Sequence, residues 1–259
     1  MCTIALLFRV ADLPLVVAAN RDELYARPTR PPEVLGPSIV GGVDALSGGT
    51  WLAVNRAGRF AAVTNQRALD PPPPGLRSRG LAVKELAMTR STAEADAYVA
   101  ALDPRAYASM NLVWGDADGV RVAYTRRDTG EKTIVDLPPG IHVLCNDVLG
   151  SADFPRGDRL YAAIDAALAR TTAFAGLVRP LEVALADHTR SALEDTPPSH
   201  LPRDLAREMT ATCIHSELYG TRSATLLALA PGRVAAYLHA DGPPCVTAFV
   251  DRKELLDAA

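Results

Sequence analysis

The chain has 259 residues, which allows one large domain or two small ones. Its hydrophobic content of 48% and charged content of 22% are ordinary for a globular protein that can bury a core without disulfides. The net charge of -3 argues against a nucleic-acid partner or an anionic membrane. No run approaches the ~18 apolar residues of a membrane-spanning helix, and the apolar start lacks signal-peptide features. We therefore expect a cytoplasmic protein whose four cysteines are reduced.

Strands are predicted in the first third, where short apolar runs are broken by Gly, Pro and Asn. Residues 3–10 and 15–19 make a first predicted hairpin. Residues 51–55 and 59–64 make a second one around Ala57-Gly58. The partial alternation of apolar residues in the second hairpin is typical of half-buried strands.

Helices and strands then alternate in blocks. A capping-box pattern from Ser91 to Glu94 predicts a helix over residues 95–102. Two further helices are expected over residues 157–170 and 181–188. Strands are expected over residues 111–115, 120–126, 223–229, 234–239 and 246–250. This order predicts an α+β fold with antiparallel sheets.

Nucleotide and metal motifs are absent from the sequence. It contains no GxGxxG, GxxxxGK[ST], HExxH or GxSxG pattern. The five histidines fall at no metal-ligand spacing, and Cys213-Ile-His215 is the nearest approach to a metal pair. Two alternating ligands on one strand or turn are weak evidence. We therefore expect neither a metal site nor a cofactor.

Cys2 is the first candidate for chemistry. A small residue at the second position permits removal of the initiator methionine, which leaves a thiol and a free α-amine on one residue. The amine has a pKa of roughly 7.7–8.0, so it can act as a base for its own side chain. The alternative is a cysteine that is simply buried at the start of a strand.

A polar segment follows the second predicted strand. Asn20, Arg21, Asp22 and Glu23 place an arginine between two acids, although a strand end needs only a turn. Such a group indicates an ion network. The alternative is a solvated hairpin end with surface ion pairs of little energetic value.

Five sequence blocks resemble the NRDE family, whose eukaryotic members are called transport and Golgi organization protein 2. They occur in the family's order and span nearly the whole chain. The blocks are MCTI at Met1 to Ile4, ANRDELYARP at Ala19 to Pro28, GGTWLAVNRAGRFAAVTN at Gly48 to Asn65, SRG at Ser78 to Gly80 and YGTRSATLL at Tyr219 to Leu227.

The family in turn is similar to the cysteine N-terminal-nucleophile hydrolases, which include conjugated bile-acid hydrolases and penicillin V acylases. The resemblance implies an αββα four-layer sandwich of two antiparallel sheets flanked by helices, as one domain over residues 1–259. It also implies a catalytic set of Cys2 as nucleophile, Asp22 beside it, Asn65 and Asn146 facing the oxyanion, and Arg222 near the nucleophile. We expect these residues to meet in one pocket.

The implied residue types suit acyl transfer. Side-chain amides can donate to the developing oxyanion, and a fixed cation such as Arg222 would favour the thiolate of Cys2. One position departs from the pattern, because the hydrolases carry an arginine three residues before the aspartate and this chain has Ala19 there. Arg21 need not replace it, since adjacent strand residues face opposite ways.

Substrate contacts are assigned to the polar segment and to the Gly48-Gly49 block, whose glycines indicate a close backbone approach. The assigned residues are Asn20, Arg21, Glu23, Thr50 and Trp51. Trp51 is equally well interpreted as a core residue.

Two functions are therefore open. The first is an N-terminal-cysteine hydrolase acting on an amide or other acyl bond of a small molecule. The second is a non-catalytic protein that binds and moves haem, lipid or acyl-CoA, which family analogy suggests. A haem cargo would need a Cys or His ligand, and the sequence carries no haem motif.

The mature protein is predicted to lack Met1, because Cys2 is small enough for the initiator methionine to be cleaved. Intact-mass spectrometry of the purified protein checks this. A mass that includes the methionine in most molecules would remove the N-terminal-nucleophile mechanism.

Overall fold

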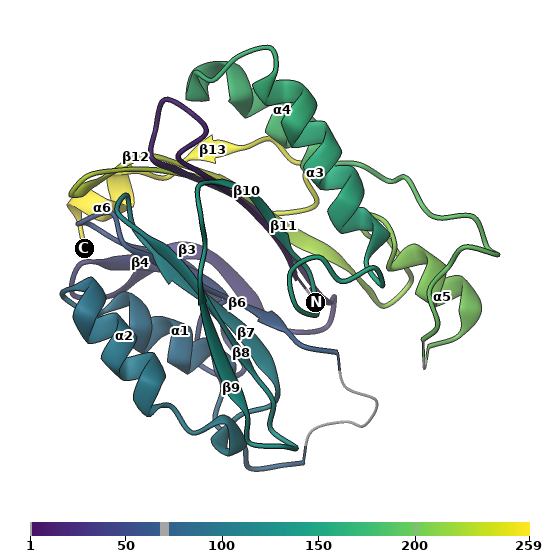
Figure 1. Cartoon of the computed structure of the whole chain (residues 1–259), viewed down its shortest axis with the longest axis horizontal. Coiled ribbons are helices and arrows are strands. Elements are labelled where there is room, and N and C mark those ends of the chain that lie inside the picture. The colour runs from purple at the N-terminus through teal and green to yellow at the C-terminus, as the bar shows by residue number, and fades with distance from the viewer. Residues whose placement is uncertain (1, 68–72, 200) are drawn as a thin grey trace. The chain divides into compact units, whose positions relative to one another are not determined.

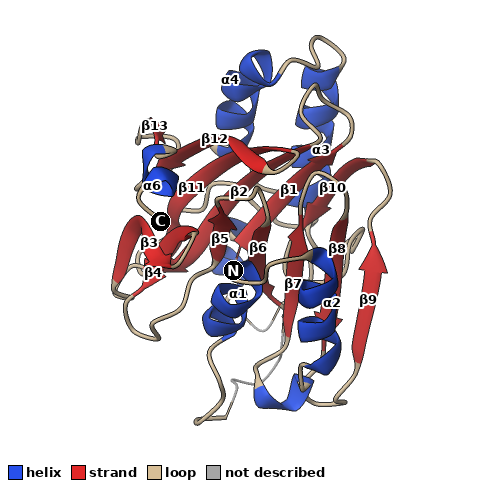
Figure 2. Cartoon of the chain, turned by 90° about the vertical axis from the view of Figure 1, so that its left-hand side faces the viewer, coloured by secondary structure: helices blue, strands red, loops and turns tan. Residues whose placement is uncertain are grey.

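Two antiparallel sheets and the helices beside them make up the fold (Figure 2). A computed structural model describes residues 2–67, 73–199 and 201–259. Met1 and His200 lie outside this range. The chain divides into two compact units, of which the first comprises residues 1–26, 139–228 and 237–251 and the second the remainder. The α+β class with antiparallel sheets is confirmed, and the single domain over residues 1–259 stays a prediction.

A six-stranded sheet forms the first unit. Its strands, in spatial order, are β10 (Gly140–Leu144), β1 (Cys2–Phe8), β2 (Leu15–Leu24), β11 (Tyr219–Ala230), β12 (Arg233–Ala240) and β13 (Val250–Asp251). Helices α3 (Pro155–Leu168) and α4 (Phe174–Leu185) pack side by side against β10, β1 and β2 (Figure 1). The short α5 (Arg203–Glu208) precedes β11.

Strand β2 continues through the polar segment. Sequence analysis ended the strand at Ala19, but residues 20–24 stay extended, and Arg21 pairs with Cys2 of β1. All of β2 up to Asp22 is buried. Polar and charged side chains can be buried on a strand only when they have hydrogen-bond or ion-pair partners, and the side chains of this segment have such partners.

A seven-stranded sheet forms the second unit. Its strands, in spatial order, are β3 (Thr29–Gly36), β4 (Ile39–Asp44), β5 (Leu52–Asn55), β6 (Phe60–Asn65), β7 (Met110–Gly115), β8 (Val120–Thr125) and β9 (Lys132–Asp136). The helical elements are α1 (Arg79–Ala87), α2 (Thr92–Ala101), η1 (Pro104–Ala106) and α6 (Glu254–Asp257). Apolar side chains of α1 and α2, including Leu86 and Val99, share a buried core with Leu112 and Trp114 of β7.

The predicted elements are mostly present. Ser91 caps α2 as expected, because its side chain accepts from the Glu94 amide at 3.1 Å. The strand predicted over residues 246–250 is wrong except at its end, since the Val246 and Thr247 amides both donate to the Pro243 carbonyl and form a turn. The sequence did not predict β3, β4, β9, β10, α1, η1, α5 or α6. The helix predicted over residues 181–188 is α4, which begins earlier, at Phe174, and ends at Leu185. Among the described residues, no helix combines the length and hydropathy needed to cross a membrane.

Gly49 is where the backbone makes the close approach that the sequence indicated. A Cβ added to this buried glycine would lie 2.4 Å from the carbonyl carbon of Gly80, and the Thr50 amide donates to the Gly80 carbonyl at 3.1 Å. Because Gly80 lies in the first turn of α1, the contact fixes this helix against the start of β5.

Gly49→Ala is predicted to destabilise the protein by about 1–3 kcal/mol, because backbone must move to admit the methyl group. Chemical denaturation measures the change. The matched control is Gly119→Ala, whose added Cβ would meet only the flexible Arg121 guanidinium at 3.6 Å. Equal stability of the two variants would contradict the proposed contact.

Candidate active site around Cys2

Cys2 begins β1 and lies directly opposite Arg21 on β2. Opposed residues of an antiparallel pair place their side chains on the same face, whereas Asp22, one residue on, points to the other face. The thiol is half-buried and the Arg21 side chain is buried. The backbone amide of Asp22 also donates to the Cys2 thiol. The strand pairing thus assembles a thiol, a cation and an amide donor.

Asp22 has a fully buried carboxyl group. Thr221 of β11 donates a hydrogen bond to its Oδ1 at 2.7 Å. On its other side, Nη1 of Arg156 lies 3.7 Å from Oδ2, and both side chains of this ion pair have no exposed surface. The pair holds a carboxylate inside the protein without leaving its charge uncompensated.

Arg156 enters the site from the first turn of α3 and is the main residue that sequence analysis missed. Its Nη2 donates to Oδ1 of Asn146 at 2.6 Å, and its Nη1 donates to the Met209 carbonyl at 3.1 Å. One guanidinium therefore orients both Asp22 and Asn146. In the sequence, the preceding Pro155 is typical of a helix start and so places Arg156 in a first helical turn. The burial of this turn has no signal of its own in the sequence.

The contact between Arg156 and Asp22 is relevant to Ala19, the position at which the similar hydrolases carry an arginine and this chain does not. The resemblance leads us to expect an arginine three residues before the aspartate, on the same strand. Here a guanidinium reaches Asp22 from a helix that follows more than a hundred residues later. A sequence pattern restricted to the strand could not identify it.

Burial raises the pKa of the Cys2 thiol, and the nearby Asp22 carboxylate adds to this effect. The charge of the N-terminal amino group, the Arg21 guanidinium and the Asp22 backbone amide lower the same pKa, in that order, but do not outweigh burial. Arg21 is thus an arginine that acts on the thiol. The expectation that Arg222 also favours the thiolate stays a prediction. In the chain that carries Met1, burial therefore outweighs the charges that favour the thiolate.

Burial also raises the pKa of Asp22, although Arg156 and the Thr221 hydroxyl pull it down. Burial raises the pKa of Tyr219 well above its ordinary value, and the charges of Asp22 and Cys2 act in the same direction. Tyr219 thus keeps its proton and can donate a hydrogen bond near Cys2 and Asp22. Its place in the YGTR block was visible in the sequence, but no role was assigned to it.

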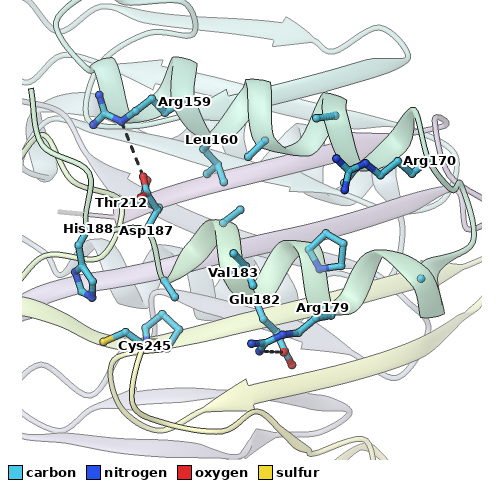
Figure 3. A pocket seen from close by; sticks show the side chains of 18 of the residues that line it. Arg159, Leu160, Arg170, Arg179, Glu182, Val183, Asp187, His188, Thr212 and Cys245 are labelled. Carbon is cyan, nitrogen blue, oxygen red and sulfur yellow. Dashed lines mark hydrogen bonds and ion pairs between the residues drawn. The ribbon is translucent and has the colours of Figure 1, made fainter.

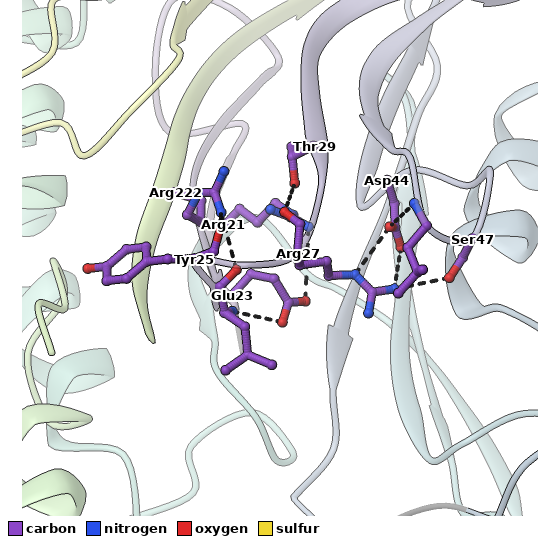
Figure 4. A network of polar contacts seen from close by, with 10 residues as sticks. Arg21, Glu23, Tyr25, Arg27, Thr29, Asp44, Ser47 and Arg222 are labelled. Atoms are coloured by element: carbon purple, nitrogen blue, oxygen red, sulfur yellow. Dashed lines mark hydrogen bonds and ion pairs between the residues drawn. The ribbon is translucent and has the colours of Figure 1, made fainter. Parts of the chain in front are cut away.

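Arg222 contacts the end of β2. Its Nη1 donates to the carbonyl of Leu24 at 3.2 Å and to that of Tyr25 at 2.6 Å, so it ties β11 to the outgoing chain (Figure 4). A further role of Arg222 near the nucleophile stays a prediction.

The substrate-binding assignments within this unit have clear contacts. The Nδ2 of Asn20 donates to the carbonyls of Leu185 at 2.8 Å and Thr212 at 2.9 Å, which fastens β2 to the end of α4. Arg21 and Glu23 form an ion pair at 4.0 Å. Both amide hydrogens of Asn20 are therefore engaged inside the protein, and its assignment as a substrate contact stays a prediction.

Three assigned residues belong to the second unit. Asn65 ends β6, opposite Met110. The buried Thr50 hydroxyl donates to the Leu52 carbonyl at 2.8 Å. The half-buried Trp51 lies against Gly42, where an added Cβ would come 2.2 Å from the indole ring. The proximity of Asn65, Thr50 and Trp51 to Cys2 stays a prediction.

A groove of 910 Å³ lies beside α3 and α4 of the first unit (Figure 3). Its lining combines apolar residues such as Leu160 and Val183 with the basic residues Arg159 and Arg170. Such a mixture of apolar surface and cations suits an amphipathic ligand.

Solved structures with a similar fold are hydrolases. A mutant of conjugated bile acid hydrolase from Clostridium perfringens has a TM-score of 0.59 and 11% identity, and the match covers 98% of this chain and 93% of that one. The Caenorhabditis elegans ortholog of N-acylethanolamine-hydrolyzing acid amidase has a TM-score of 0.53 and 10% identity, with 88% and 92% covered. At these identities the likeness shows the fold alone, and it confirms the resemblance to N-terminal-nucleophile hydrolases.

Sequence comparisons show the family. The human Transport and Golgi organization protein 2 homolog is 30% identical over 228 residues, covering 82% of this chain and 81% of the relative. The Bos taurus homolog is 28% identical over 227 residues, with the same coverage. The sequence model described as Transport and Golgi organisation 2 matches residues 1–237. The chain therefore belongs to the Transport and Golgi organisation 2 family.

Proposed function

We propose that the protein is an N-terminal-cysteine hydrolase that cleaves an amide or other acyl bond of a small molecule. The observation that carries this proposal is that the half-buried Cys2 pairs with Arg21, directly next to the buried Asp22–Arg156 pair in the strand. A protein that needed only a stable strand would gain nothing from burying two charges at this strand end, since apolar residues of similar volume stabilise at least as well. The names of the similar solved structures support the same class of chemistry.

The first chemical step joins Cys2 to the substrate. After loss of Met1, the free α-amine takes the thiol proton as the sulfur attacks the carbonyl carbon. A base is needed because the thiolate, not the thiol, is the nucleophile. Asp22, held by Thr221 and Arg156, orients and balances the resulting ammonium group.

The oxyanion is stabilised by amide donors. Arg156 occupies the Oδ1 atom of Asn146, which fixes the orientation of this side-chain amide. The ammonium then returns its proton to the leaving amine as the carbon–nitrogen bond breaks and a thioester remains. Water hydrolyses the thioester, and the carboxylic acid and the free thiol are released.

Trapping the thioester tests the proposal. Mature protein is mixed with a panel of N-acyl amides and p-nitrophenyl esters and is analysed by intact-mass spectrometry and peptide mapping. We expect the acyl mass on the Cys2 peptide, and its absence in Cys2→Ala. Acylation that persists in Cys2→Ala, or no turnover of any amide, ester or thioester by mature protein, would overturn the hydrolase proposal.

A non-catalytic carrier is the second candidate, and the groove beside α3 and α4 favours it. Its apolar lining and the cations Arg159, Arg170 and Arg179 suit an acyl chain with an anionic head group such as acyl-CoA. Incubation of mature protein with fluorescent acyl-CoA separates the candidates, because a carrier returns its ligand intact whereas a hydrolase releases the cleaved acyl group.

Alkylation of Cys2 by iodoacetamide is predicted to depend on Arg21. The Arg21 guanidinium lowers the thiol pKa, so Arg21→Met should raise this pKa and slow labelling at neutral pH. Asp22→Asn should do the reverse, because it removes a carboxylate that raises the pKa. Rates are read from the Cys2 peptide across a pH series.

Arg222→Ala is the informative comparison. The structure places its guanidinium on the Leu24 and Tyr25 carbonyls, so its effect on the labelling rate at neutral pH should be smaller than that of Arg21→Met. If Arg222→Ala slows labelling and Arg21→Met does not, the assignment of Arg21 is wrong.

Arg156→Met is predicted to cost about 3–5 kcal/mol of unfolding free energy, because it leaves the Asp22 carboxylate buried without its cation. Adding Asp22→Asn to Arg156→Met should restore part of that loss. Denaturation of both single variants and the double variant gives the coupling energy. The control is Arg179→Met, whose exposed ion pair with Glu182 should be worth only ~0.3–0.5 kcal/mol. Additive effects at positions 22 and 156 would contradict the pairing.

A further inference from the structure

A cluster of two thiols and two imidazoles lies within the first unit, apart from the residues around Cys2. It consists of His188, which follows α4, Cys213 and His215, which precede β11, and Cys245, which follows β12. One potential ligand atom from each residue lies within 4.8 Å of all the others. Three chain segments converge here, so the cluster does not result from sequence proximity alone.

The separations among Cys213, His215 and Cys245 match tetrahedral coordination. Zn–S bonds of about 2.3 Å and Zn–N bonds of about 2.0–2.1 Å at tetrahedral angles place two sulfurs about 3.8 Å apart and a sulfur and a nitrogen about 3.6 Å apart. The Sγ atoms of Cys213 and Cys245 are 3.8 Å apart. Nε2 of His215 lies 3.6 Å from the Cys213 sulfur and 3.3 Å from the Cys245 sulfur.

A backbone carbonyl orients the fourth group. Nδ1 of His188 lies 3.0 Å from the Cys213 carbonyl oxygen, so this nitrogen carries the proton and donates. The lone pair is then on Nε2, the arrangement found when metal-bound histidines donate their second ring N–H to a carbonyl. The His188 and His215 rings lie close together, with centroids 4.9 Å apart.

A disulfide does not account for this geometry. Bonded sulfurs are about 2.05 Å apart, whereas Cys213 and Cys245 are separated by 3.8 Å. A disulfide would also leave the convergence of His188 and His215 unexplained. Sequence analysis predicted no metal site because only Cys213 and His215 are neighbours in the chain.

We propose that His188, Cys213, His215 and Cys245 bind one zinc ion. Two Zn–S bonds and two Zn–N bonds form, and the two thiol protons pass to solvent. Because the protein supplies all four ligands, the site is of the closed, structural kind. The exposed His188 and His215 give the ion an entry path.

The ion would hold in place the segment that leads to the site around Cys2. The Cys213 amide donates to the Asp187 carbonyl at 2.8 Å, and the neighbouring Thr212 carbonyl accepts from Asn20. Further along, the Ile214 amide donates to the hydroxyl oxygen of Thr221 at 2.9 Å, and Thr221 in turn donates to Asp22. Zinc thus stabilises this segment whether or not Cys2 is a nucleophile.

Metal analysis of the full-length protein tests the proposal. Protein purified under reducing conditions is titrated with zinc against a chromophoric chelator, and bound metal is measured by mass spectrometry. We expect one zinc per chain. Cobalt(II) added instead should give the intense visible bands of a tetrahedral ion and thiolate-to-cobalt charge transfer, a readout that needs no variant.

Variants identify the ligands. Cys245→Ser and His188→Gln alter side chains near the surface and should each weaken zinc binding by more than the roughly 10–100-fold lost when only a ligand's hydrogen-bond partner is removed. Cys2→Ser removes a thiol outside the cluster and should leave stoichiometry and affinity unchanged. Binding of zinc by Cys245→Ser with unchanged affinity would overturn the proposal. So would a cobalt complex without thiolate bands, or a reduced protein that binds no zinc.

Discussion

The buried pair of Asp22 and Arg156 is the constraint on which the rest of the candidate site depends. A carboxylate cannot be buried at the end of a central strand unless a cation and hydrogen-bond donors accompany it. Helix α3 must therefore begin where its first turn reaches β2, and β11 must bring Thr221 to the other oxygen. The same guanidinium holds Asn146, so the end of β10 is positioned by this pair as well.

This arrangement explains why charge is present in a region where the sheet is otherwise apolar. Strands β1 and β2 are buried along almost their whole length, and a structural strand pair would be completed with apolar side chains. The half-buried Cys2 thiol lies on the opposite face of the sheet from the carboxyl group but next to the Asp22 backbone amide. Burial raises the pKa of this thiol, which favours a mechanism in which a base removes the proton during attack.

A second set of contacts lies apart from Cys2 and Asp22. It joins the end of α4 and the segment before β11 to the same sheet. The Asn20 amide joins β2 to the end of α4 and to Thr212. Immediately beyond, Cys213 and His215 approach His188 and Cys245. The segment before β11 is therefore held from both sides, and its position determines where Tyr219 and Thr221 lie.

The sequence by itself determined the fold class and the family, and it drew attention to the polar segment of the candidate site. Apolar periodicity and turn residues located most strands, and the capping box at Ser91 located α2, because these signals depend on neighbours within a few residues. The polar segment after Ala19 stood out because a strand end needs no arginine between two acids. Its extension of β2 was not predicted, since only buried partners make that conformation acceptable.

Only the tertiary structure decided which residues accompany Cys2 and Asp22 within the first unit. Arg156 is an ordinary helix-start arginine in the sequence, and its role arises because α3 packs its first turn against β2. The metal-type cluster was invisible for the same reason, because His188 and Cys245 lie far from Cys213 in the chain. Contacts between distant segments depend on how the sheet and helices pack, and no local spacing records that packing.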